Sequence, residues 1–214
     1  MKWFRIPKEK CKQPKKGVYN DWKELLAREA NSQCVYCAIH ENAYGGFRNF
    51  HVEHYRPKSN AKFKKLIHVF RNLFYACSIC NTFKGEDWPC DPPPKLHKPC
   101  YADPAKIDYS EIFIINSNGE VIGKNIAARY MIEKLYLNRP QLMMERRTFL
   151  LKNELEENIL EFRKNTNELM RVKTAKAATR ALLEKAALLS IDILQLCLDY
   201  SKIRPYKPTE ILRP

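Results

Sequence analysis

Cys34-Val35-Tyr36-Cys37 and Cys77-Ser78-Ile79-Cys80-Asn81 enclose a central His51-Val52-Glu53-His54 in the first half of the chain. Thiolates bind zinc tetrahedrally, and two cysteines separated by two residues can reach one ion from a single tight turn. Two such pairs complete a closed site, so Cys34, Cys37, Cys77 and Cys80 are predicted to bind a structural Zn²⁺. The interval between the pairs is longer than the ~15–20 residues of a simple zinc ribbon. The ion would therefore hold both ends of an inserted motif.

Two arrangements compete with this zinc site. The four cysteines could instead be two unrelated pairs of buried or redox-active thiols, although no βαβ pattern of a thioredoxin-like protein surrounds them. Cys90, His97 and Cys100 could form a second metal site, but prolines interrupt their spacing.

The composition and charge bound the class of protein. The chain has 214 residues, 45% hydrophobic and 29% charged, which is typical of a globular protein. Its net charge is +14, and residues 1–85 carry 17 Lys and Arg against 6 Asp and Glu, whereas residues 86–214 carry 21 against 18. A positive field around the cysteine motif favours nucleic acid, DNA in particular, as a partner. Solubility alone, or binding to an acidic protein, would also account for it.

The location follows from what the sequence lacks. No apolar run approaches the ~18 residues of a membrane span, and Met1-Lys2-Trp3-Phe4-Arg5 has no signal-peptide core. We therefore expect a cytoplasmic protein with no membrane partner, in which the cysteines are thiols or zinc ligands rather than disulfides.

The first half of the chain is predicted to form a small motif of short helices and a strand. Residues 1–18 form a basic arm, expected to be extended and either to contact phosphates or to be solvated. A short helix is predicted from Asn20, as N-cap, to about Ala30. The alternation in 50–55 predicts a strand, and a short helix is expected from Cys77 to about Lys84, ended by Gly85.

The second half is predicted to be mainly helical. A proline-rich connector spans 86–110, and the Asn-Gly turn within 112–123 predicts a β-hairpin. Helices are expected over about 125–137, 138–164 and 172–202, the last with an apolar stripe. These elements predict an α+β chain with a zinc-clipped domain at 1–90 and a second domain at 91–214.

Glu53-His54 suits the hydrolysis of phosphodiester bonds. A carboxylate oxygen can hold a hard divalent cation next to the scissile phosphate. A neutral imidazole can take a proton from water, since its pKa lies near neutrality. Adjacent side chains of a strand face opposite ways, so the two groups would share one site only if the backbone turns there, as the break at Arg56-Pro57 allows.

The ordered motifs of residues 34–85 resemble the HNH (His-Me finger) endonuclease family. The resemblance rests on Cys34-x-x-Cys37, Val52-Glu53-His54-Tyr55-Arg56-Pro57-Lys58, Asn72-Leu73 and Ala76-Cys77-x-x-Cys80-Asn81-x-x-Lys84-Gly85. It implies a ββα-metal fold, a hairpin followed by a helix around one catalytic ion, and an enzyme that cleaves nucleic acid.

The resemblance also assigns roles to individual residues. It gives His54 as the general base, Glu53 as a metal ligand and Asn72 as the residue that braces the loop orienting His54. Asn81 stands where many members have a metal-binding histidine, and its amide oxygen suits Mg²⁺ or Mn²⁺. The expected phosphate contacts are Arg56, Lys58 and Lys84.

A narrower resemblance links His51–Ser59, the helix after Cys77 and Leu135-Tyr136-Leu137-Asn138-Arg139-Pro140 to HNH nucleases of Septu-type anti-phage systems, sometimes found beside retrons. It implies a defence effector that works with an ATPase subunit, which would dock on the C-terminal helices. Two other functions are open: a non-catalytic zinc module that binds nucleic acid, and an assembly subunit whose helical domain binds another protein.

Overall fold

A computed structural model of the chain describes residues 2–8, 11–171 and 176–202, which form two compact units, Met1–Met143 and Met144–Pro214. The boundary predicted at residue 90 therefore falls inside the first unit. The physical reason is a shared core: one cluster of buried apolar side chains runs from Trp3 through Tyr101 to Leu142. The connector and second hairpin pack into the zinc-motif domain instead of starting a new one.

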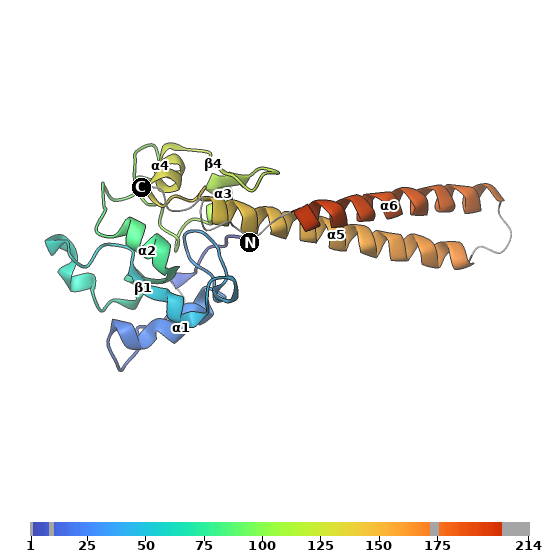
Figure 1. Cartoon of the computed structure of the whole chain (residues 1–214). Coiled ribbons are helices and arrows are strands. Elements are labelled where there is room, and N and C mark those ends of the chain that lie inside the picture. The colour runs from blue at the N-terminus through green and yellow to red at the C-terminus, as the bar shows by residue number, and fades with distance from the viewer. Residues whose placement is uncertain (1, 9–10, 172–175, 203–214) are drawn as a thin grey trace. The chain divides into compact units, whose positions relative to one another are not determined.

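A β-hairpin followed by a helix forms the centre of the first unit (Figure 1). Strand β1 (Phe50–His54) pairs antiparallel with β2 (Leu73–Cys77), with Phe50 opposite Cys77 and His54 opposite Leu73. Helix α2 (Ser78–Lys84) follows directly, capped by the Cys77 side chain and ended by Gly85 at φ 50°. The predicted strand–helix order is thus present, and the chain is α+β.

The N-terminal segment differs from the predicted arm. Trp3 and Ile6 are buried, and the Trp3 indole N–H donates to the Tyr36 carbonyl at 2.9 Å. Lys8 is also buried and forms an ion pair with Glu29. The apolar side chains between the lysines thus hold this segment on the core, so it is not a solvated arm.

Helix α1 (Lys23–Glu29) continues from a 3₁₀ turn at Tyr19–Trp22. Asn20 is not its N-cap, because it lies inside that turn, and the Asp21 carboxylate accepts from the Val18 N–H instead. Further 3₁₀ turns lie in the loops of the first unit, at Glu41–Ala43, Phe47–Asn49, Ala61–Leu66 and Phe70–Asn72.

The rest of the first unit contains α3 (Tyr109–Ile112), β3 (Phe113–Ile115), β4 (Val121–Gly123) and α4 (Ile126–Lys134). Strands β3 and β4 pair antiparallel, which confirms the predicted hairpin. Helix α4 ends before the predicted residue 137 because the chain turns at Tyr136, whose φ is 47°. After that turn, the Asn138 side chain binds both the N–H and the carbonyl of Val121, at 2.7 and 2.9 Å.

The second unit is a pair of long helices. Helix α5 (Pro140–Arg171) begins in the first unit and continues into the second, where α6 (Lys176–Lys202) lies beside it (Figure 1). Lys185 of α6 pairs with Glu161 of α5 at 2.6 Å. Of the predicted apolar stripe, Leu189 and Leu196 are buried but Leu183 is exposed. The predicted start of the last helix at 172 lies outside the described residues.

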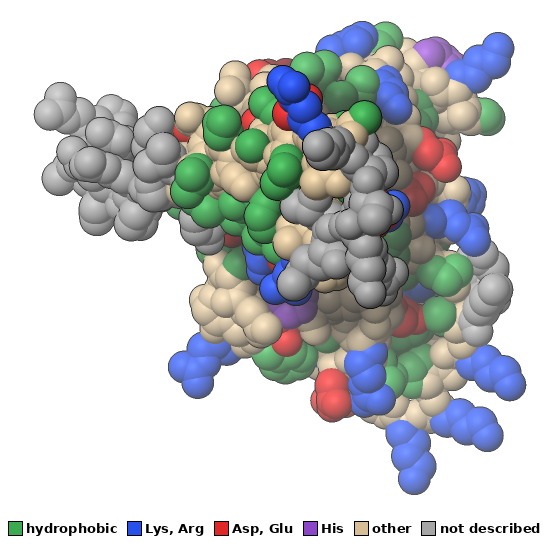
Figure 2. All heavy atoms as spheres, turned by 90° about the vertical axis from the view of Figure 1, so that its right-hand side faces the viewer, with side chains coloured by type: hydrophobic (Ala, Val, Ile, Leu, Met, Phe, Trp, Pro, Cys, Tyr) green, Lys and Arg blue, Asp and Glu red, His purple; other side chains and the backbone are tan. Residues whose placement is uncertain are grey.

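Two surface properties complete the description. Within the described part of the chain, no helix is both long and apolar enough to span a membrane. Lysine and arginine side chains project around the face drawn in Figure 2, with scattered acidic side chains among them.

Candidate functional site

The four predicted zinc ligands converge at one end of the β1–β2 hairpin. The sulfur atoms of Cys34, Cys37, Cys77 and Cys80 all lie within 4.8 Å of one another, and all four residues are buried. Cys34 and Cys37 lie on a tight turn closed by the Cys34 N–H to the Ile39 carbonyl at 2.9 Å. Cys77 ends β2, and Cys80 lies in the first turn of α2. The two pairs therefore approach from separate segments, as the spacing predicted.

The spacing of the sulfur atoms fits zinc. Sγ of Cys37 and Sγ of Cys77 are 3.8 Å apart. A tetrahedron of thiolates with Zn–S bonds of about 2.3 Å has sulfur–sulfur edges of about 3.8 Å. A disulfide needs about 2.05 Å, and all four cysteines are free thiols. The cluster can hold a metal ion, and four sulfurs with no open position are typical of a structural zinc site.

Arg139 lies against this cluster, a contact that no motif or spacing in the sequence predicts. Its Nη2 atom is 3.9 Å from Sγ of Cys77 and of Cys80 and 4.0 Å from Sγ of Cys37. The guanidinium thus faces three of the four sulfurs from the turn between α4 and α5. Burial opposes ionisation of Cys37, yet the neighbouring thiols and Arg139 together hold the pKa of the Cys37 thiol well below its usual range. Burial and the hydrogen bonds of the neighbouring cysteines raise the pKa of the Cys34 thiol well above its usual range. The cluster thus favours the thiolate, the form that binds metal, at Cys37 and not at Cys34.

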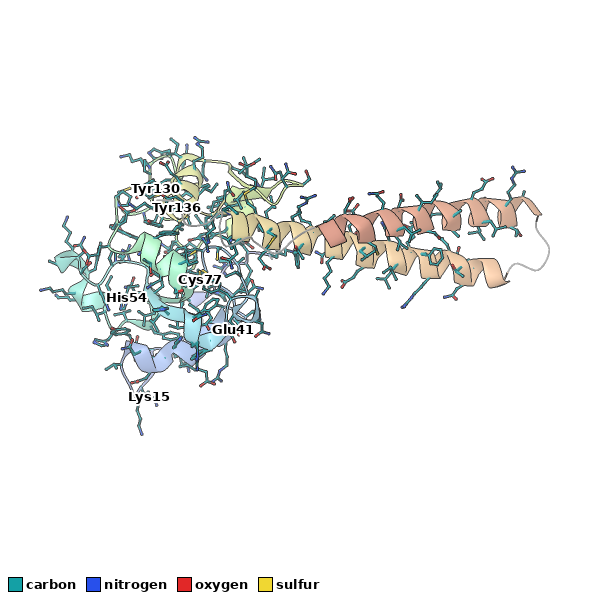
Figure 3. The ribbon with its side chains drawn as sticks, in the orientation of Figure 1. Lys15, Glu41, His54, Cys77, Tyr130 and Tyr136 are labelled. Carbon is teal, nitrogen blue, oxygen red and sulfur yellow. The ribbon has the colours of Figure 1, made fainter. Side chains whose placement is uncertain are left out.

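His54 lies at the opposite end of the hairpin from Cys77 (Figure 3). Its Nε2 atom is 3.1 Å from the carbonyl oxygen of Ile67, and its ring meets the Tyr19 ring edge-on at 4.8 Å between centroids. A carbonyl only accepts, so Nε2 carries the proton and Nδ1 keeps its lone pair. Burial, aided by the charges of Lys58 and Lys84, lowers the pKa of His54, while the Ile67 contact opposes the shift. The imidazole is therefore neutral near pH 7.

Asn72 ties together the loop that orients His54. Its Oδ1 accepts the Arg56 N–H at 2.9 Å, and its Nδ2 donates to the carbonyls of Arg56 at 3.1 Å and Leu66 at 3.4 Å. Leu66 precedes Ile67, whose carbonyl holds the imidazole. Asn72 thus connects the start of this loop at Arg56 to Leu66 near its end.

Glu53 is 3% exposed and engages different partners from its neighbour His54. Its Oε1 accepts from the Tyr36 hydroxyl at 3.1 Å and from the Lys84 ammonium at 2.8 Å. Burial raises the pKa of Glu53, and Lys84 and Tyr36 oppose that rise.

Lys84 does not fit the phosphate contact predicted for it. It is 1% exposed, and besides Glu53 its ammonium binds the carbonyl oxygen of His54 at 3.0 Å. An ammonium so enclosed has no face to offer a phosphate. Its position late in α2, next to β1, explains why spacing alone misplaced it.

A cavity of about 230 Å³ joins three of the four predicted catalytic residues, and Asn72 does not line it. It is lined by Val52, Glu53, His54, Pro57, Lys58, Ser59, Asn81, Gly85 and Glu86. Glu53 and Asn81 therefore share a cavity with His54 although they come from different elements. The adjacent residues Glu53 and His54 both line this cavity, although side chains of neighbouring residues face opposite ways in a regular strand.

The remaining predicted phosphate contacts differ in their surroundings. Lys58 is exposed, lines the cavity and donates to the Tyr19 hydroxyl at 3.1 Å. Arg56 forms an ion pair with Asp91 at 3.0 Å and does not line the cavity.

Among the described residues no second group of metal ligands includes Cys90, His97 and Cys100, so the alternative metal site at these three residues is not formed.

Tyr19 and Arg139 are the contacts that sequence reasoning missed. Both lie outside the cysteine-bounded segment, and neither has a spacing that marks it. The only signal for Arg139 was its place in Leu137-Asn138-Arg139-Pro140, which by itself does not indicate a sulfur contact.

Searches of curated proteins and of solved structures found no match to the chain. The model of the HNH endonuclease family matches residues 34–87, the segment from the first cysteine pair to just beyond α2.

Proposed function

We propose that the chain is a metal-dependent endonuclease that hydrolyses phosphodiester bonds of nucleic acid, with DNA as the expected substrate. One observation carries the proposal: His54, held through Nε2 by the Ile67 carbonyl, shares a cavity with Glu53 and Asn81. The match of residues 34–87 to the HNH endonuclease family supports the same activity.

His54 would act as the general base. The Ile67 contact leaves Nδ1 unprotonated, and the lowered pKa keeps the imidazole neutral where the enzyme works. Nδ1 would take a proton from the water that attacks phosphorus. Asn72 would hold the loop so that the ring stays in this orientation.

Glu53 and Asn81 would hold the catalytic Mg²⁺ or Mn²⁺. In the described part of the chain no hydrogen bond engages Oε2 of Glu53 or the Asn81 carboxamide, although both residues line the cavity. Oxygen donors of these two kinds suit such cations. When bound, the ion supplies positive charge beside the scissile phosphate and the leaving oxygen. The zinc at the far end of the hairpin would only maintain its shape.

The biological setting proposed is anti-phage defence with an ATPase partner. The support is the resemblance to Septu-type nucleases, together with exposed apolar side chains on α6 that could contact another protein: Leu183, Leu188, Ile191 and Leu194.

The test is nicking of supercoiled plasmid DNA by the purified chain with Mg²⁺ or Mn²⁺. We expect nicking that is lost in His54→Ala and without divalent cation, and that returns when Mg²⁺ is added back to protein of unchanged zinc content. His97→Ala, which removes an exposed loop histidine, is the matched control and should retain full activity.

If the chain alone is inactive, the assay is repeated with the ATPase subunit of such a system. If wild-type chain is also inactive with the ATPase subunit, or if wild type and His54→Ala are equally active, the result would contradict the proposal. It would favour the non-catalytic binding or assembly subunit instead.

A further inference from the structure

A second, larger cavity adjoins the one at His54. It measures about 430 Å³ and shares Val52, Lys58 and Asn81 with the first. We call it the basic groove and define it by its lining residues: Tyr19, Asn20, Lys23, Arg48, Phe50, His51, Val52, Lys58 and Asn81. Because the two cavities have a common wall, a chain-like ligand at His54 can continue into the groove.

The two cavities differ in charge. Glu53 and Glu86 line the first, whereas the basic groove has no acidic lining residue and three cations, Lys23, Arg48 and Lys58. The first cavity is therefore suited to a cation and the second to anions.

The cations of the groove have no acidic partner in direct contact, although the Glu41 carboxylate lies near enough to Lys23 to attract its charge. Across residues 2–8, 11–171 and 176–202, none of the three groove cations forms an ion pair, in contrast to Arg28 with Glu24 and Arg56 with Asp91. The charge of Lys23, Arg48 and Lys58 thus remains available to a ligand.

Two of these side chains are already held in position. The Lys23 ammonium donates to the Phe47 carbonyl at 2.8 Å and lies 4.1 Å from the centre of the Phe47 ring. The Lys58 ammonium donates to the Tyr19 hydroxyl. Each ammonium has three N–H donors and so keeps at least one for a phosphate oxygen. Less side-chain freedom is lost on binding when the cation is held in advance.

We propose that the basic groove binds the sugar–phosphate backbone of the nucleic-acid strand next to the phosphate at His54, with Lys23 and Arg48 each contacting a phosphate. This inference rests on the proposed function and extends it. Lys23 belongs to α1, outside the segment that matches the HNH family model. The binding surface would therefore be built jointly by the HNH segment and the N-terminal helix.

The test measures binding separately from cleavage. Fluorescence anisotropy of a labelled DNA duplex and of its single strand is recorded over a series of salt concentrations, with His54→Ala as the parent protein. Lys23→Ala/Arg48→Ala removes two groove charges. Lys95→Ala/Lys98→Ala removes two exposed charges from a loop that lines neither cavity and is the matched control.

The expected size follows from counterion release. Two lost phosphate contacts should lower the slope of log K against log salt by about 1.8 for duplex or about 1.4 for single strand. At about 0.1 M salt, the slope change of about 1.8 expected on duplex DNA corresponds to a loss of affinity of roughly 60-fold. The control should change the slope by less than half as much. Arg48→Ala alone, at an exposed site, should lower the slope by about 0.9 on duplex.

Equal losses of DNA affinity in the groove variant and the control would overturn the inference, because DNA binding would then depend only on the net positive charge of the protein. An unchanged slope in Arg48→Ala would overturn it as well. The result is separate from the nuclease proposal. If the groove substitutions weaken DNA binding in a chain that never nicks DNA, the groove is supported and the nuclease activity is rejected. If the chain nicks DNA but the groove substitutions leave DNA binding unchanged, the nuclease activity is supported and the groove is rejected.

Discussion

Nη2 of Arg139 lies 3.9 Å from Sγ of Cys80. Four thiolates around Zn²⁺ carry a net charge of −2, and the site is buried, so an adjacent cation offsets a charge that water cannot reach. Arg139 immediately precedes α5 and follows Asn138, which binds the β4 backbone. The short turn between α4 and α5 thus joins the four-cysteine cluster to the second hairpin.

Arg139→Met should weaken zinc binding. Loss of the guanidinium removes the N–H···S contacts and leaves the thiolates without their counter-charge, and such outer-shell changes cost about 10- to 100-fold in metal affinity. Competition with a colorimetric chelator measures the change. Arg139→Lys should fall between wild type and Arg139→Met because it keeps the charge but not the fork of donors. Arg147→Met, at an exposed arginine, is the control. Equal zinc affinity in Arg139→Met and wild type would refute the role.

Cys77→Ser should abolish stoichiometric zinc and destabilise the chain. Cys77 is one of the four sulfur ligands and its side chain also caps α2. A serine hydroxyl can keep that cap, so the expected destabilisation comes from loss of the metal ion. A loss of about 3 kcal/mol lowers Tm by roughly 6–12 °C in a chain of this size. Zinc content by atomic absorption and thermal unfolding by circular dichroism are the measurements. Cys197→Ser, at an exposed cysteine of α6, should change neither. Full zinc content in Cys77→Ser would exclude the four-thiolate site.

The local elements of residues 34–87 could be predicted because each has a local cause. The alternation before His54 marks β1, the Cys-x-x-Cys pairs mark the metal ligands, and Gly85 marks the end of α2. Contacts between residues far apart in the sequence have no such local signal. Nothing near Arg139 in sequence indicates its contact with the thiols. Lys84 has the sequence setting of a surface lysine, and only the packing of α2 on β1 buries it against Glu53. The same holds for Tyr101, which belongs to the core of the first unit although nothing near it in sequence indicates those contacts.

The rate of cleavage should depend on pH through His54. Burial and the nearby lysines lower the pKa of His54 below its ordinary 6.5. The base works only when neutral, so kcat/KM, which reports the free enzyme, should fall on the acidic side with an apparent pKa below 6.5, and a cation held by Glu53 would shift it in the same direction. Lys58→Gln removes one of the charges and should raise that value. The pH profile of nicking at DNA concentrations well below saturation measures both. An acid limb above 6.5 in wild type would contradict the assignment of His54.

Lys84→Met should destabilise the protein through Glu53. It leaves a buried carboxylate without its counter-ion, which costs about 3–5 kcal/mol. Burial, then less opposed, should raise the pKa of Glu53 further, so stability should fall as pH rises above the unfolded value near 4.5. Urea unfolding at several pH values measures this. Lys84→Met/Glu53→Gln should regain most of the loss, since the charge is gone. Lys95→Met, at an exposed site, should stay within about 0.5 kcal/mol of wild type. A double variant no more stable than Lys84→Met would contradict the pairing.

Asn72→Ala should lower kcat and leave DNA affinity unchanged. The Asn72 amide joins Arg56 to Leu66, and Leu66 precedes the carbonyl that orients His54, so its loss lets the imidazole turn without altering any groove cation. A misplacement near 1 Å can cost about 100-fold in rate. Single-turnover nicking and anisotropy with the same DNA separate the two effects, and zinc content verifies the fold. Asn118→Ala, in the exposed turn of the second hairpin, is the matched control and should alter neither. If Asn72→Ala weakened DNA binding as much as it slowed cleavage, Asn72 would support the binding surface rather than position the base.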